Sequence, residues 1–270
     1  MENKELLLEF LSCPLNSGDL IYEKFSALPG AISKKGEKPY ERYVYIPGAR
    51  KDRVVLTAHI DTVWDKDYTE LGGCKVGEHE IIFEDGVFRS GNVICGIGAD
   101  DRAGCAMLWK LRDSGHSILL LDGEEDGKRG AWFLRKSSPG LYKELNRHSF
   151  MIALDHIGTN HVSFKQVDNT EKFKAYFTEK TGFVDHNISG GCDLQVIAQT
   201  VCGANVGVGY HECHSSYEFL NLAEWENTYE KLRSFLALKQ PRLKTTFKSR
   251  AVKLARGSVG KTLRALKLKK

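Results

Sequence analysis

The stretch VVLTAHID, residues 54–61, decides the fold, because a short apolar run passes directly into a histidine and an aspartate. Such a run suits a strand that is covered on both faces of a sheet. Three more apolar runs occur, at 118–121, 151–154 and 205–209. Helical stretches alternate with the four runs, at 102–113, 129–136, 169–180 and 193–200. This alternation predicts an α/β fold with a mostly parallel central sheet.

Further elements frame this sheet. Apolar residues at helical spacing predict helices at 4–12, 19–28 and 222–238. An alternating pattern predicts a strand at 40–46, and residues 81–88 read as a hairpin that turns on Asp85-Gly86. We therefore expect one domain over residues 1–239.

The cysteines and the apolar content indicate where the protein works. The chain carries seven cysteines and no Cys-x-x-Cys pair. An odd number without paired spacing favours free thiols in a reducing cytoplasm over a disulfide framework or a structural zinc site. No apolar run reaches the roughly 18 residues of a membrane span, and the N-terminus lacks the pattern of a signal peptide. We expect a cytoplasmic protein without a membrane span.

The charge is divided between the body and the end of the chain. The net charge is +4, but residues 240–270 hold eleven Lys and Arg and no Asp or Glu, which leaves residues 1–239 at −7. The simplest interpretation of residues 240–270 is a flexible, solvated basic tail. Two alternatives stay open: a weak contact with a polyanion such as nucleic acid, and a weakly amphipathic helix.

Polar residues follow each apolar run where the predicted strand ends. The sequence places them as follows: His59 and Asp61 after the first run, Asp122, Glu124 and Glu125 after the second, Asp155 after the third, and Tyr210, His211 and His214 after the fourth. Asp100 and Asp101 open the helix predicted at 102–113. Sites in open parallel sheets form beyond the carboxyl ends of the strands, so we expect these side chains to converge.

Each motif alone has an ordinary explanation, such as a helix cap at Asp100 or a solvated Glu124-Glu125 pair. Their joint occurrence at the strand ends has none. Several carboxylates gathered in one crevice repel one another unless cations hold them together. The pattern therefore predicts a site for two divalent metal ions.

The sequence resembles the co-catalytic di-zinc exopeptidases, the superfamily of the leucyl-type aminopeptidases, peptidase T and the glutamate carboxypeptidases. The resemblance covers roughly residues 54–238 and rests on five motifs in order: His59-x-Asp61, Gly98-Ala99-Asp100-Asp101, Glu124-Glu125, Asp155, and HSSYEF at 214–219. It implies a three-layer α/β sandwich and a metal-dependent exopeptidase.

The resemblance also implies a role for each site residue. His59 and Asp155 would bind one metal ion, Glu125 and His214 would bind the other, and Asp100 would bridge the two. Glu124 would be the general base, and Asp61 would hold the ring of His59 from behind. A cis peptide bond between Asp100 and Asp101 is a further implied feature.

The implied cofactors are two divalent ions, zinc in the first place, with cobalt or manganese as substitutes. They would lower the pKa of a shared water, and Glu124 would take the proton of that water as it attacks a peptide bond. The substrate would be a peptide or an N-acyl amino acid. Only 58 residues separate Asp155 from His214, which leaves no room for a lid domain and predicts a compact single catalytic domain.

Several alternatives stay open. His214 fits the motif better than His211, and Tyr210 is a candidate to stabilise the reaction intermediate, although its offset from His214 matches poorly. Asp155 favours an aminopeptidase, whereas a carboxypeptidase or an N-acyl amino acid deacylase of the same fold is the main competing activity. A non-catalytic binding protein is the remaining class.

Overall fold

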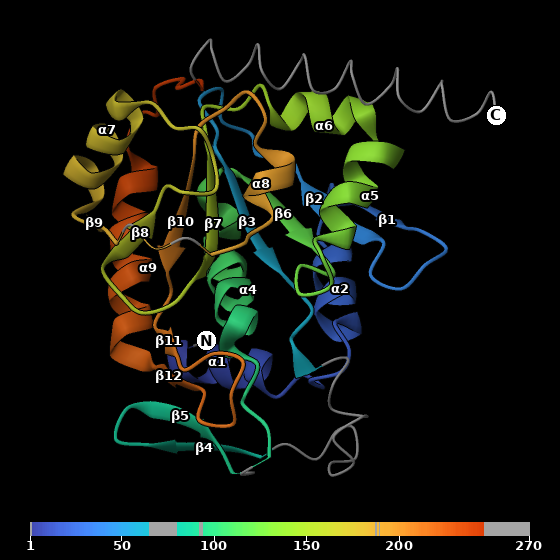
Figure 1. Cartoon of the computed structure of the whole chain (residues 1–270), viewed down its shortest axis with the longest axis vertical. Helices are drawn as coiled ribbons and strands as arrows, with labels where there is room; N and C mark the ends of the chain where they lie inside the picture. The colour runs from blue at the N-terminus through green and yellow to red at the C-terminus, as the bar shows by residue number, and fades with distance from the viewer. Residues whose placement is uncertain (1, 65–79, 92–93, 187, 189, 246–270) are drawn as a thin grey trace, which may run out of the picture.

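The protein is described by a computed structural model that covers residues 2–64, 80–91, 94–186, 188 and 190–245. Its centre is an eight-stranded sheet in the order β1-β2-β6-β3-β7-β10-β8-β9 (Figure 1). The strands are β1 (Ile32–Lys35), β2 (Arg42–Ile46), β3 (Val55–His59), β6 (Ser117–Leu121), β7 (Met151–His156), β8 (His161–Ser163), β9 (Val184–Asp185) and β10 (Gly203–Gly207).

The four apolar runs form the middle of this sheet, as the sequence predicts. β6, β3, β7 and β10 lie side by side and pair in parallel, and every residue of β3, β6 and β10 is buried. Antiparallel pairing occurs towards the edges, where β2 joins β6 and β8 joins β10. The sheet is therefore mixed, with a parallel core.

Helices cover both faces of the sheet and make three layers, which confirms the expected sandwich. The helices are α1 (Asn3–Leu11), α2 (Asp19–Ser26), α4 (Ala99–Leu111), α5 (Arg129–Ser137), α6 (Pro139–Leu145), α7 (Glu171–Thr181), α8 (Leu194–Ile197) and α9 (Leu222–Ala237), with a 3₁₀ turn at Arg112–Ser114. One layer contains α1, α2, α4, α7 and α9, and the other contains α5, α6 and α8.

The alternation of side chains along the strands explains the two layers. Leu56 of β3 packs into the larger core beneath α4 and α9, whereas its neighbour Val55 packs into the smaller core beneath α5 and α8. Successive residues of a strand point to opposite faces, so an uninterrupted apolar run fills both cores at once. All described elements join this sandwich or the small sheet described next, and none of them forms a separate lid.

A second sheet of four short strands lies at one end of the molecule (Figure 1). Its order is β11-β12-β5-β4, with β4 (Ile81–Glu84), β5 (Val87–Ser90), β11 (Tyr210–His211) and β12 (Phe219–Asn221). β4 and β5 form the expected hairpin, and its turn residue Asp85 has a φ of 50°. This sheet connects the hairpin to the loop that carries His214.

Several predicted elements differ from the structure at their ends, and two of these differences have a visible cause. The helix expected at 193–200 ends at Ile197, because the side chain of Asn146 accepts the amides of Gln199 and Thr200 at 2.8 and 2.9 Å. The strand expected at 205–209 begins earlier and ends at Gly207. Beyond it the chain turns at Gly209, where φ is 89°.

The packed part of the chain extends to Thr245, six residues past the expected boundary at 239. The amide of Leu243 donates to the backbone oxygen of Ser149, its own carbonyl accepts the amide of Cys202, and Gln240 and Thr245 are buried. The rest of the predicted basic tail, residues 246–270, lies outside the described residues. Among the described residues, no helix has both the length and the apolar character needed to cross a membrane.

Candidate active site

The predicted site residues converge beyond the carboxyl ends of the parallel strands. A cavity of about 500 Å³ lies there, between the end of β3, the turn after β6 and the loop after β10. Six of the seven expected residues line it: His59, Asp100, Glu124, Glu125, Asp155 and His214. Asp61, the seventh, lies directly behind them and is 2% exposed.

His59 is held at both ring nitrogens. Its Nδ1 lies 3.0 Å from the backbone oxygen of Asp61 and 3.3 Å from Asp61 Oδ1. Its Nε2 lies 3.1 Å from Asp100 Oδ1 and 3.5 Å from Asp155 Oδ1. The ring therefore points one nitrogen at the carboxylates in the cavity and the other at the residue expected to hold it.

The two oxygens of Asp100 face different partners. Oδ1 approaches His59, whereas Oδ2 lies 3.2 Å from His214 Nε2. His214 Nε2 is also 2.8 Å from Glu125 Oε1. Asp100 thus stands between two groups of ligand atoms, and its peptide bond to Asp101 is cis, as the resemblance implies.

Glu218, a member of the HSSYEF motif without an assigned role, positions the Asp100 loop. Its buried carboxylate accepts the amides of Ile97, Gly98 and Asp100 at 2.8, 2.7 and 3.0 Å. A Cβ at Gly96 would lie only 2.4 Å from Glu218 Oε2. The loop therefore wraps tightly around this one carboxylate.

Asp61 also holds the turn after β6. Its Oδ1 accepts the amide of Glu124 and its Oδ2 accepts the amide of Glu125, both at 3.1 Å. One carboxylate therefore fixes the backbone of two site residues as well as the ring of His59.

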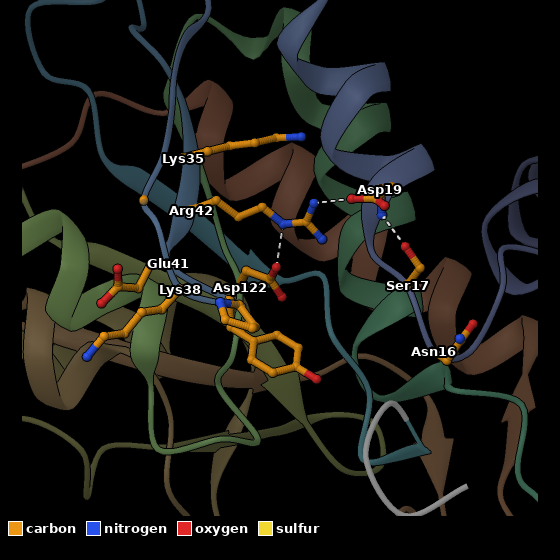
Figure 2. Close-up of a pocket in the computed structure, with 11 residues that line it drawn as sticks. Asn16, Ser17, Asp19, Lys35, Lys38, Glu41, Arg42 and Asp122 are labelled. Carbon is orange, nitrogen blue, oxygen red and sulfur yellow. Dashed lines mark hydrogen bonds and ion pairs between the residues drawn. The ribbon is translucent and has the colours of Figure 1, made fainter. Parts of the chain in front are cut away.

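The same turn is anchored from the opposite side by Arg42. Figure 2 shows its guanidinium between the carboxylates of Asp122 and Asp19, beside a separate cavity of about 330 Å³. Burial raises the pKa of Asp122 to about 6, with Asp61 adding to the effect and Arg42 opposing it. Arg42 offsets part of the cost of burying an acid beside the site.

His211, the alternative histidine, lies away from the ligand cluster. Its Nε2 is 2.6 Å from Glu224 Oε2, and its ring stacks on Phe219. Tyr210 lines the cavity and donates its hydroxyl to Asp155 Oδ1 at 3.4 Å. The geometry thus groups His214, and not His211, with Asp100 and Glu125.

The cluster is short of positive charge. Burial raises the pKa of Asp155 to about 8, against the opposing effect of His59. Hydrogen bonds to Asp100 and Glu125 raise the pKa of His214 to about 10. Both shifts occur where several carboxylates are gathered in one crevice, an arrangement that bound cations would stabilise.

The donor atoms suit such cations. Three sets, His59–Asp100–Asp155, His59–Glu124–Glu125 and Asp100–Cys213–His214, each bring their ligand atoms within 4.8 Å of one another. Imidazole and carboxylate donors are typical of zinc sites. The sequence did not point to Cys213, whose thiol joins the His214 side of the cluster. Burial raises the pKa of the Cys213 thiol to about 12.

Comparisons with known proteins agree on the fold. No protein-family model and no curated protein matches the sequence. Among solved structures, aminopeptidase PepT from Bacillus cereus is 15% identical, with 88% of this chain and 98% of that chain aligned at a TM-score of 0.62. A tripeptidase from Staphylococcus aureus has the same identity and coverage at 0.61. An aminopeptidase from the archaeon Desulfurococcus kamchatkensis is 13% identical, with 88% and 95% aligned at 0.60. The chain therefore shares the α/β fold of these aminopeptidase and tripeptidase structures.

Proposed function

We propose that the protein is a two-metal exopeptidase, an aminopeptidase in the first place, that hydrolyses the N-terminal peptide bond of short peptides. The observation that carries this proposal is the position of Asp100, whose two oxygens face His59 and His214 separately at 3.1 and 3.2 Å. One carboxylate shared by two groups of ligands suits a pair of ions. The fold shared with structures described as aminopeptidases and a tripeptidase supports it.

The ligand sets follow from the same geometry. His59, Asp155 and Asp100 Oδ1 would hold one ion. Glu125, His214 and Asp100 Oδ2 would hold the other. Two zinc ions, or cobalt or manganese in their place, would activate a water and polarise the carbonyl of the substrate.

Glu124 is the proposed general base. Its carboxylate lines the cavity next to the ligands but takes part in neither of the two ion positions proposed above. It takes a proton from the attacking water and delivers it to the leaving amine. Asp61 keeps this base in register with Glu125, because it holds the amides of both residues at 3.1 Å.

Metal analysis and a substrate panel test the proposal. The full chain, purified with zinc present, should bind about two ions and hydrolyse peptides with a free amino terminus. The panel should also contain peptides blocked at the amino terminus and N-acyl amino acids, which report the carboxypeptidase and deacylase alternatives. Binding of zinc without hydrolysis of any member would favour the non-catalytic class. The cytoplasmic location remains part of the proposal and rests on the sequence.

A further inference from the structure

Among the residues that the structure describes, a single side chain of permanent positive charge lines the cavity. Lys128 is the only Lys or Arg among the described residues that line it. The other charged or titratable groups of the lining are the carboxylates, the histidines, Tyr210 and Cys213. Lys128 takes part in none of the ligand sets and has no role in the proposed mechanism.

Lys128 is held beside the proposed base. Its Nζ lies 2.9 Å from Glu124 Oε1, and its amide donates to the backbone oxygen of Glu124 at 3.0 Å. An ammonium carries three N–H donors, so the contact with Glu124 leaves two free to bind another acceptor. Its side chain is 18% exposed, in the wall of the cavity.

The backbone around Lys128 is shaped to present this ammonium. Lys128 is the N-cap residue directly before α5 and has a φ of 64°, a left-handed conformation that side-chain-bearing residues rarely adopt. Opposite it, a Cβ on Gly191 would lie 2.8 Å from Lys128 Nζ. The absence of a side chain at Gly191 therefore gives the ammonium its place.

The local charges keep Lys128 protonated. Burial lowers its pKa, but the hydrogen bond and charge of Glu124 outweigh this and raise it above the ordinary value. A charged donor in a partly enclosed cavity forms stronger hydrogen bonds with an anionic acceptor than with a neutral one.

We propose that Lys128 binds the terminal carboxylate of the substrate and thereby makes dipeptides with a free C-terminus the preferred substrates. This inference rests on the proposed function. A carbonyl held at the ligand cluster and a carboxylate one residue further along the chain are separated by roughly 3.5 Å. Lys128 lies next to Glu124, which acts on that carbonyl, so the group within its reach is the end of a dipeptide. Ile157 and Ile188 in the same cavity offer apolar contact to the side chains.

Leucyl-alanine and leucyl-alanine amide differ only in the C-terminal group, which is a charged carboxylate in the first and a neutral amide in the second. Assays of both compounds with the zinc-loaded full chain therefore measure what the charge of the carboxylate contributes. We expect kcat/KM for the acid to exceed that for the amide by about 10- to 100-fold, mostly through KM, as a charge-assisted hydrogen bond implies. Lys128→Met should bring this ratio close to one, and Lys128→Arg should restore part of it.

Two further variants sharpen the assay. Gly191→Ala displaces the Lys128 ammonium without removing its charge, so it should also reduce the ratio. Lys136→Met, at an exposed lysine of α5 outside the cavity lining, is the matched control and should keep the wild-type ratio.

A wild-type ratio near one, or a ratio that survives Lys128→Met, overturns the assignment of Lys128 while leaving the peptidase intact. The ratio for the wild type is measured without any variant, so its outcome does not depend on whether a mutant folds. Failure of the wild type to cleave either compound, while it still hydrolyses longer peptides of the panel, overturns the dipeptide preference alone. Failure on the whole panel is a different result, because it refutes the proposed function and the inference that rests on it.

Discussion

The cluster of proposed metal ligands has a buried half and an exposed half, and Asp100 lies between them. On the β3 side, the side chains of His59 and Asp155 are 2% and 10% exposed and lie directly at strand ends. On the other side, His214 is 48% exposed, on a loop where its φ is 62°. Its partner Glu125 follows a tight turn and is 16% exposed.

This difference separates what the sheet fixes from what loops assemble. His59 and Asp155 stand at the ends of β3 and β7, which pair in parallel in the middle of the large sheet. His214 depends on a loop that leads from β11 into β12. We infer that an ion beside His59 occupies a preformed site, whereas an ion beside His214 completes its own site and exchanges more easily.

The largest effect is expected from removing Asp100, the carboxylate proposed to bind both ions. Asp100→Ala deletes the carboxylate that faces both halves, so we expect loss of both ions and of all measurable hydrolysis. Elemental analysis after gel filtration, with circular dichroism as a control for folding, checks this. Two ions retained by the variant would place the bridge at another residue.

Glu124→Gln should separate catalysis from binding. The variant removes the proposed base and no ligand of either proposed ion, so turnover should fall by about 100- to 10,000-fold while both ions stay bound. Kinetics and metal content measured on the same sample give the result. An unimpaired rate would remove Glu124 from the mechanism.

Chelation should distinguish the halves directly. Titrated with a chelator, the zinc-loaded wild type should release its ions in two stages, the one beside His214 first. His214→Ala should lack the early stage, and His59→Ala should lack the late one. His211→Ala is the matched control and should behave like the wild type, because His211 bonds to Glu224 outside the cluster. Equal loss of ions from His211→Ala and His214→Ala would show that the loop register is wrong.

Glu218→Gln tests whether the carboxylate that holds the Asp100 loop contributes to metal binding in both halves of the cluster. The amide retains one acceptor oxygen but loses the charge that receives three backbone N–H groups. Loss of such an outer contact typically weakens metal affinity by about 10- to 100-fold. A competition titration against a zinc indicator measures the metal affinity of the variant. Unchanged affinity would show that the Asp100 loop keeps its conformation without the charge of Glu218.

The smallest effect on catalysis is expected from deleting residues 246–270, which contain no ligand of either half. Activity and metal content should stay at the wild-type level. The nine Lys and Arg removed should, however, abolish any binding of nucleic acid seen by gel shift at low salt. In the full chain that binding should weaken steeply between about 50 and 200 mM salt. Binding that persists after truncation would disprove the electrostatic proposal.

The parallel core of the fold was predictable because four apolar runs had to be strands buried on both faces. The edge strands were not. Every residue of β1 and β9 is exposed, so they carry no apolar pattern that could mark them. The early end of α8 was equally hidden, because it depends on Asn146, about 50 residues earlier in the chain.

The candidate site divides in the same way. The structure brings together the residues that the five motifs named, since all but His214 stand close to the end of a strand or the start of a helix that the sequence predicts. His214 is placed by the loop between β11 and β12. The contacts of Glu218 could not be predicted, because they join residues about 120 positions apart in the sequence. Lys128 is only four residues from Glu124, but that spacing does not show that the pair lies in the wall of the cavity. Cys213 belongs with them, since nothing in a lone cysteine marks it as close to Asp100 and His214.

The exposed edges of the large sheet have a consequence for handling the protein. A sheet edge presents unpaired backbone groups to which another molecule can add a strand. On one side β1 exposes Lys34 and Lys35, whose charges oppose such stacking, and on the other β9 is only two residues long. We therefore expect the protein to resist edge-to-edge aggregation when it is concentrated. Replacing both lysines by valine would remove that protection on the β1 side and favour polymerisation.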